Sequence, residues 1–84
     1  MPYIKQDGRK FIEPHLNAVS SFIRNGGDLN YCFTILCKNF IKSFGESYTT
    51  HAVCISALEN AKLEWYRRRI VPYEDKKITE NGDV

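Results

Sequence analysis

The sequence HAVCISALENAKLEWYRRRI, residues 51–70, decides the fold, and it ends just before Pro72. Its apolar positions predict a helix with two apolar faces. One face is centred on Leu58, and the second, roughly 120 to 140° away, holds Leu63 and Ile70. Two readings stay open: the helix is central and has a neighbour on each side within a monomer, or the Leu63/Ile70 side is a subunit interface.

Apolar residues at helical spacing predict two more helices, at about residues 14–24 and 29–44. No segment alternates apolar and polar residues as a half-buried strand does. Short connections make neighbouring helices antiparallel. The expected fold is all-α, a compact three-helix bundle with a short N-terminal helical turn and a polar C-terminal tail. We expect one domain over residues 1–84, whose tail, residues 73–84, is either mobile or packed back.

Individual residues predict where these helices begin and end. Pro14 suits the first turn of a helix and not its interior, so the first main helix is expected to start there. Asp28 is expected to be the N-cap of the second helix, and Thr49 or Thr50 the N-cap of the third. Pro72 is expected to end the third helix.

Composition disfavours several classes of protein. The net charge of +2 is too small for nucleic-acid binding by bulk charge. No apolar run approaches the roughly 20 residues of a membrane span, and the N-terminus lacks the apolar stretch of a signal peptide. The 3 cysteines form no CxxC pair and are typical of small core residues in a reducing compartment. We therefore expect a cytoplasmic protein without a membrane partner.

The residues that carry catalysis or hold metals show no recognisable pattern. His15 and His51 lack partners at the spacing of a helical metal site. His51 and Cys54 lie three apart on one helix, and such pairs rarely reach attack geometry without a third group. A P-loop, a GxGxxG loop and a serine elbow are absent. A helix-turn-helix is disfavoured because the arginines lie at the wrong end of the second helix of the pair. We expect no enzyme, no cofactor and no metal site.

The run Arg67-Arg68-Arg69 allows a structural and a functional interpretation. Positive charge at a helix C-terminus complements the helix dipole, and Glu64 is spaced to pair with the run. Arg69 falls on the apolar face and therefore needs an anionic partner. Glu74 and Asp75 are candidates within the chain, and an external phosphate is the alternative.

Other aromatic residues lie beside cationic ones. Tyr31 shares a face of the second helix with two lysines, and that face is either a solvated surface or one that stacks a nucleotide. Tyr3 with Lys5, and Tyr73 in the tail, look like arms with aromatic anchors. Such arms pack across a neighbouring subunit, fold over a ligand or stay disordered.

Five motifs distributed over nearly the whole chain resemble those of a family of small uncharacterised proteins found in bacteria, archaea and their phages. They are MPYIKQ (1–6), GDLNY (27–31), AKLEWYRR (61–68), PYEDKK (72–77) and ENGDV (80–84). The family is a domain of unknown function, so the resemblance supplies no catalytic residues. It implies a prokaryotic or viral cytosolic setting.

The first functional hypothesis is a non-enzymatic, homo-oligomeric binding protein. In size, expected helical content and lack of catalytic groups, the chain is similar to phage anti-defence proteins that sequester nucleotide signals of bacterial immunity. The expected ligand is a cyclic or phosphorylated nucleotide held at a subunit interface. The expected ligand-binding residues are Tyr3, Lys5, Tyr31, Tyr66 and Arg69, and the expected interface residues are Leu63, Ile70 and Tyr73.

A second hypothesis is a protein–protein adaptor or an inhibitor of a host protein. In it, the side that holds Leu63 and Ile70 engages the partner together with the tail, and the arginines only cap the helix. A nucleic-acid-associated regulator is a weaker third option, which a steep salt dependence of binding would reveal.

Overall fold

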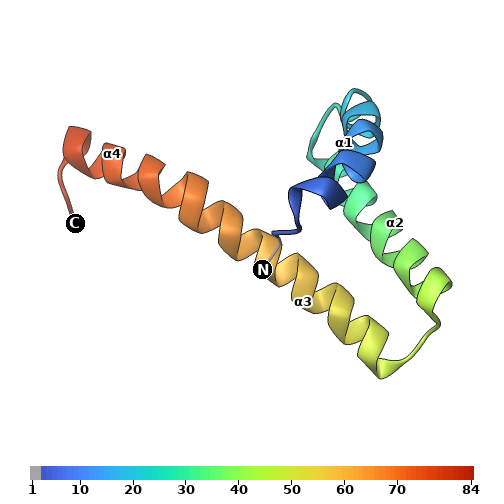
Figure 1. Cartoon of the computed structure of the whole chain (residues 1–84). Helices are drawn as coiled ribbons and strands as arrows, with labels where there is room; N and C mark the ends of the chain where they lie inside the picture. Colours follow the sequence, from blue (N-terminus) through green and yellow to red (C-terminus); the bar gives the residue numbers. More distant parts are fainter. Residues whose placement is uncertain (1–2) are drawn as a thin grey trace. The chain divides into compact units, whose positions relative to one another are not determined.

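A computed structural model describes residues 3–84 (Figure 1), which form two units, residues 3–54 and residues 55–84. The order of helices is α1 (Gln6–Ser20), α2 (Gly26–Phe44), α3 (Tyr48–Trp65), η1 (Tyr66–Ile70) and α4 (Val71–Asn81). No strand occurs among the described residues. The predicted all-α class with three main helices is confirmed.

The N-terminal helix is longer than predicted. Helix α1 runs without interruption from Gln6 to Ser20 and contains Pro14 in its interior. The separate N-terminal turn and the helix start at Pro14 are therefore wrong. Proline removes one backbone donor and crowds the preceding turn, but the apolar face of the helix continues on both sides of it. The Nε of Arg9 donates to the carbonyl oxygen of Ile4 at 2.8 Å and so ties the residues before the helix to its first turn.

Helix α2 begins at a cap formed by Asn25, and the predicted N-cap Asp28 lies in its first turn. The Oδ1 atom of Asn25 accepts a hydrogen bond from the backbone N–H of Asp28 at 2.8 Å. The carboxylate of Asp28 in turn accepts from the backbone N–H and the Nε of Arg24, each at 3.0 Å. The first bond satisfies a donor that a helix start leaves unpaired, and the other two tie Arg24, the residue before the cap, to the first turn. Gly26 and Gly27 are therefore helical.

Helix α3 begins at Tyr48, so its start lies before the predicted N-caps Thr49 and Thr50. Ser47 and Thr50 form a reciprocal pair in which each side-chain oxygen accepts from the other residue's backbone N–H, at 3.1 and 3.0 Å. This is the geometry of a capping box with threonine in the place of the usual glutamate. Gly45, which ends α2, has a φ of 88°, a conformation that favours glycine.

Among residues 3–84, Cys54 is the buried apolar residue, with 8% of its surface exposed. Its thiol donates to the carbonyl oxygen of Cys37 over 3.8 Å. Burial raises the pKa of the Cys54 thiol, and the neighbouring Cys37 raises it further. The three cysteines are free thiols, and the place of Cys54 agrees with the predicted role as a small core residue.

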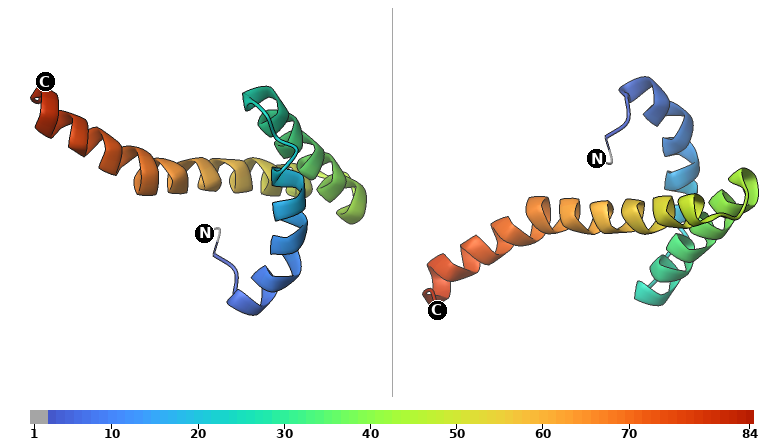
Figure 2. Two further views of the ribbon diagram at one scale, coloured as in Figure 1. Left: turned by 90° about the horizontal axis from the view of Figure 1, so that it is seen from above. Right: turned by 90° about the horizontal axis from the view of Figure 1, so that it is seen from below.

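The helix that holds Trp65 does not end at Pro72. Helix α3 passes into η1, one turn of π-helix, and then into α4, as the yellow-to-red ribbon shows (Figures 1 and 2). Pro72 has no N–H for the carbonyl four residues earlier, and its ring would collide with that carbonyl. In η1 the N–H of Val71 instead bonds to the carbonyl of Tyr66, five residues earlier. The wider turn makes room for the ring, so the predicted stop at Pro72 is wrong.

The segment predicted as a polar tail is largely helical. Helix α4 continues to Asn81, and Gly82, with a φ of 87°, ends it. The N–H of Gly82 bonds to the carbonyl of Ile78 at 2.8 Å. Lys77 pairs with Glu80 at 3.1 Å along the same face.

Replacing Pro72 with alanine should convert η1 into ordinary α-helix. Alanine supplies the missing N–H and removes the ring, so the amide of residue 72 should bond to the carbonyl of Arg68 and be protected from hydrogen exchange. We expect the free energy of unfolding to rise by about 1 to 3 kcal/mol. NMR-detected hydrogen exchange and denaturant titration measure the two effects. An unprotected amide at residue 72 would contradict this cause for the π turn.

The start of α2 should depend on pH through Asp28. The side chain of Arg24, and secondly its backbone N–H, hold the pKa of the Asp28 carboxyl below its ordinary value of 3.8. A lowered folded-state pKa stabilises the helix above the ordinary pKa, and the contribution disappears as the pH falls through the lowered value. Circular dichroism melts should therefore show Asp28→Asn less stable than wild type near neutral pH. An equal gap in strongly acidic buffer would contradict this.

Candidate functional site

Aromatic and cationic side chains alternate every four residues along the helix from Trp65 to Lys77. The guanidinium carbon of Arg69 lies 5.5 Å from the centre of the Trp65 ring. The ammonium of Lys77 lies 5.7 Å from the centre of the Tyr73 ring. We call these four residues the cation–aromatic row. Each pair has the spacing and distance of a cation–π interaction between neighbours on one helix face.

The three arginines of the run have different environments. Glu64 pairs with Arg67 at 3.0 Å and with Arg68 at 2.7 Å, as the sequence predicts for helix-stabilising pairs. Within residues 3–84, Arg69 forms no ion pair with a carboxylate. Its contact is the Trp65 ring. Arg69 is therefore the cation of the run whose charge no acidic side chain in the described part of the chain neutralises.

Tyr66, a predicted ligand-binding residue, begins the π turn. Its hydroxyl donates to Glu74 over 3.4 Å. Glu74 is one of the two acids predicted to pair with Arg69, and it bonds to Tyr66 instead. The physical reason is η1, because a turn with more residues advances by a smaller angle per residue and therefore changes which side chains line up across it.

The predicted interface residues lie on the unit formed by residues 55–84. Leu63 is 53% exposed and Tyr73 is 59% exposed, while Ile70 is half-buried. Trp65 of the cation–aromatic row is 61% exposed. The large apolar side chains of Leu63, Trp65 and Tyr73 are exposed, and whether a second chain covers them stays a prediction.

The remaining predicted ligand-binding residues belong to the unit formed by residues 3–54. Tyr3 and Lys5 precede α1 and are exposed. Tyr31 lies on α2 and helps to line a hollow of about 500 Å³. Tyr3 and Lys5 are not among the residues that line it. Within this unit, the predicted set is therefore not brought together at the hollow.

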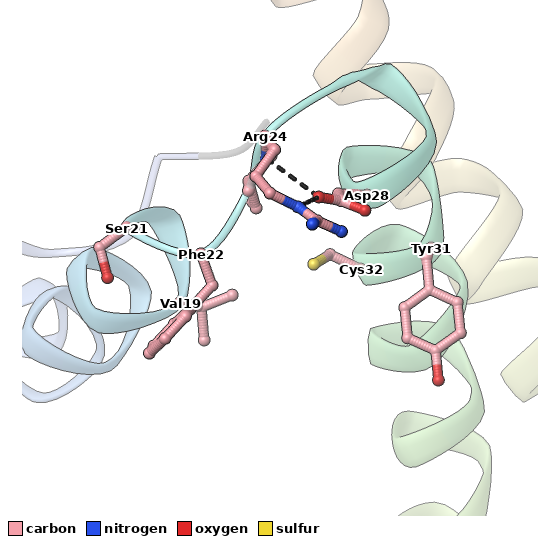
Figure 3. A pocket seen from close by; sticks show the side chains of 8 residues that line it. Val19, Ser21, Phe22, Arg24, Asp28, Tyr31 and Cys32 are labelled. Atoms are coloured by element: carbon pink, nitrogen blue, oxygen red, sulfur yellow. Dashed lines mark hydrogen bonds and ion pairs between the residues drawn. The ribbon is translucent and has the colours of Figure 1, made fainter.

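The hollow lies between the end of α1 and the first turns of α2 (Figure 3). The Phe22 and Val19 side chains lie on one side, and those of Asp28, Tyr31 and Cys32 come from α2. Arg24, held by Asp28, lies above it. The sequence alone does not predict this site, because the hollow depends on where α1 ends and where Asn25 caps the next helix. Its lining residues are Val19, Ser21, Phe22, Ile23, Arg24, Asp28, Tyr31 and Cys32.

The structure also shows the surroundings of the residues that could bind a metal or act as a nucleophile. No group of three or more side chains in the described part of the chain has the arrangement to hold a metal ion. The His51 ring bonds to Glu46 at 3.1 Å, and the Cys54 thiol bonds to the Cys37 carbonyl. No helix in residues 3–84 has the length and apolar character needed to cross a membrane.

Comparison with known proteins identifies the family. One family model, described as a domain of unknown function (DUF6899), matches residues 1–84. Neither the curated proteins nor the solved structures yield a match. Because the family model spans the whole of the sequence, the chain belongs to this family of domains of unknown function.

Proposed function

We propose that the chain is a non-enzymatic, cytoplasmic binding protein whose cation–aromatic row takes a ligand with a flat ring and a phosphate. The observation that carries this proposal is the row itself, with Arg69 beside Trp65 and Lys77 beside Tyr73. Aromatic faces stack bases, worth about 1 to 3 kcal/mol per base. Guanidinium groups bind phosphate through paired, charge-assisted hydrogen bonds. A cyclic or otherwise phosphorylated nucleotide has both features.

The electrostatic environment of Arg69 supports a phosphate rather than a neutral ligand. Glu64 is shared between Arg67 and Arg68, so the arginine run keeps an excess of positive charge. An arginine whose charge no described carboxylate neutralises can accept an anion without first breaking an ion pair. Sequestration of a nucleotide immune signal by a phage-associated protein is the role we propose for such a site, by analogy with small anti-defence proteins.

A second candidate function is that of an adaptor or inhibitor of a host protein. The exposure of Leu63 and Tyr73 favours it, because exposed apolar patches on small proteins mark surfaces that bind other proteins. In that case the cation–aromatic row contributes to a protein interface, where tyrosine, tryptophan and arginine are the residues that dominate binding energy.

Isothermal titration with a panel of cyclic di- and mononucleotides tests the proposal. We expect one class of nucleotide to bind, and Arg69→Ala to weaken that binding by about tenfold or more, since a charge-assisted contact contributes roughly 1.5 to 3 kcal/mol. Arg67→Ala is the matched control, because Glu64 already pairs with Arg67, and it should stay within about threefold of wild type.

Two results would count against the proposal. If no nucleotide of the panel binds, the nucleotide proposal is wrong and the adaptor hypothesis is favoured. Equal losses for Arg69→Ala and Arg67→Ala would mean that the ligand senses only the overall charge of the run. Trp65→Leu, which removes the ring but keeps an apolar side chain, should also lose binding if bases stack on this row.

A further inference from the structure

Part of the helix from residue 55 to residue 81 repeats its residue types in reverse order about a midpoint. The midpoint is Arg68, which is also the central residue of η1. At four distances from Arg68, an apolar residue on one side has an apolar or aromatic residue on the other. These matching pairs are Leu58 with Ile78, Leu63 with Tyr73, Trp65 with Val71, and Tyr66 with Ile70.

Two pairs of charged residues follow the same reversal with opposite signs, whereas Arg67 and Arg69, on either side of Arg68, carry the same charge. Glu59 is as far from Arg68 as Lys77, and Lys62 is as far from it as Glu74. The whole segment is polarised in the same sense. Residues 55–69 hold four basic and two acidic side chains, a net charge of +2, while residues 70–84 hold two basic and four acidic side chains, a net charge of −2.

We propose that the helix formed by residues 55–81 pairs antiparallel with the same helix of a second copy of the chain, with the two-fold axis at Arg68. In an antiparallel pair, a residue before the midpoint meets the residue equally far beyond the midpoint of the partner. Every apolar pair named above then joins apolar to apolar, and both charged pairs join acid to base. A two-fold axis produces each contact twice.

The apolar residues of this helix cover a broad arc. At about 100° per residue, Leu58 and Trp65 lie on one flank of the helix and Leu63 on the other. The π turn rotates the residues after it back toward the first flank, which places Ile70 between the flanks and Tyr73 beside Trp65. Tyr66 and Ile70 therefore lie nearest the centre of this arc, Leu58, Trp65 and Tyr73 lie toward one edge, and Leu63 lies toward the other.

Charge selects this orientation over the parallel one. A parallel pair in register would place Glu59 opposite Glu59 and Lys62 opposite Lys62, and it would align the two positive halves and the two negative halves. Like charges that face each other across an interface disfavour that pairing. The antiparallel pair instead aligns the positive half of each helix with the negative half of the other.

The pairing has a consequence for ligand binding, and this consequence rests on the proposed function. A two-fold axis perpendicular to both helices carries the flank with Trp65 and Arg69 onto the same side of the pair. Two cation–aromatic rows then lie next to each other, and the arginine runs of both chains meet near the axis. An anion bound there would offset the repulsion between Arg67 of one chain and Arg69 of the other.

Paired charge reversals in the full chain test the register. The first variant carries Glu59→Lys and Lys62→Glu, and the second carries Glu74→Lys and Lys77→Glu. The first retains an ion pair within its own helix, since Glu59 and Lys62 lie 3.3 Å apart in the wild type. Neither variant changes the net charge of +2. Light scattering measures the mass in solution of the wild type, of each variant alone and of their mixture. Circular dichroism checks that each variant remains helical.

The expected result is selective pairing. The wild type should have the mass of a dimer, and each variant alone should dissociate with a constant raised at least about tenfold, because two attractive pairs become repulsive in each half. The two variants mixed should form a mixed dimer, in which every reversed residue again meets an opposite charge. A monomeric wild type, variants that dimerise as tightly as wild type, or a mixture no tighter than its parts would each overturn the register.

Binding of nucleotide is read separately, so the two proposals fail in different ways. If the mixed dimer forms and no nucleotide binds, the pairing stands and the proposed ligand does not. If a nucleotide binds a wild-type chain that stays monomeric, the ligand proposal stands and the pairing is overturned.

Discussion

The nitrogen of Pro72 carries no hydrogen, and the course of the helix from residue 55 to residue 81 depends on that missing donor. A regular α-helix would place the proline ring against the carbonyl four residues earlier. Widening one turn into η1 avoids the collision and lets the helix continue. The same turn changes which side chains line up on either side of it. It places Glu74 within hydrogen-bonding distance of Tyr66. The cation–aromatic row begins at Trp65, just before this turn, and continues after it to Lys77.

How much of the fold the sequence could predict depends on the kind of signal. Apolar periodicity predicted the all-α class, because each helix repeats its apolar residues with the helical period. The helix starts were misplaced, because Asn25 and Asp28 are both good cap acceptors and only the backbone geometry decides between them. Pro14 and Pro72 were read as boundaries, because the rule for proline describes an isolated helix. Helix α1 nevertheless runs through Pro14 without interruption, and a π turn lets the later helix pass Pro72.

The candidate site was predictable to a similar extent. Arg69 was singled out because a cation on an apolar face needs a partner, and its neighbour proved to be Trp65. That contact could have been found from the four-residue spacing. The hollow beside Phe22 could not, since it exists only where one helix ends and the next is capped. Leu63 and Tyr73 are exposed, and covering their apolar area would be worth about 25 cal/mol per Å².

Distances between spin labels on two copies of the chain show directly whether the helices pair and in which orientation. With the three native cysteines replaced, single cysteines at Asn60 and Asn81 carry the labels. A helix rises about 1.5 Å per residue, so antiparallel pairing about Arg68 predicts separations near 24 Å for residue 60 and near 39 Å for residue 81. Short separations at both positions would mean parallel helices, and the absence of any dipolar coupling at either position would mean no pair at all. Both results would contradict the account.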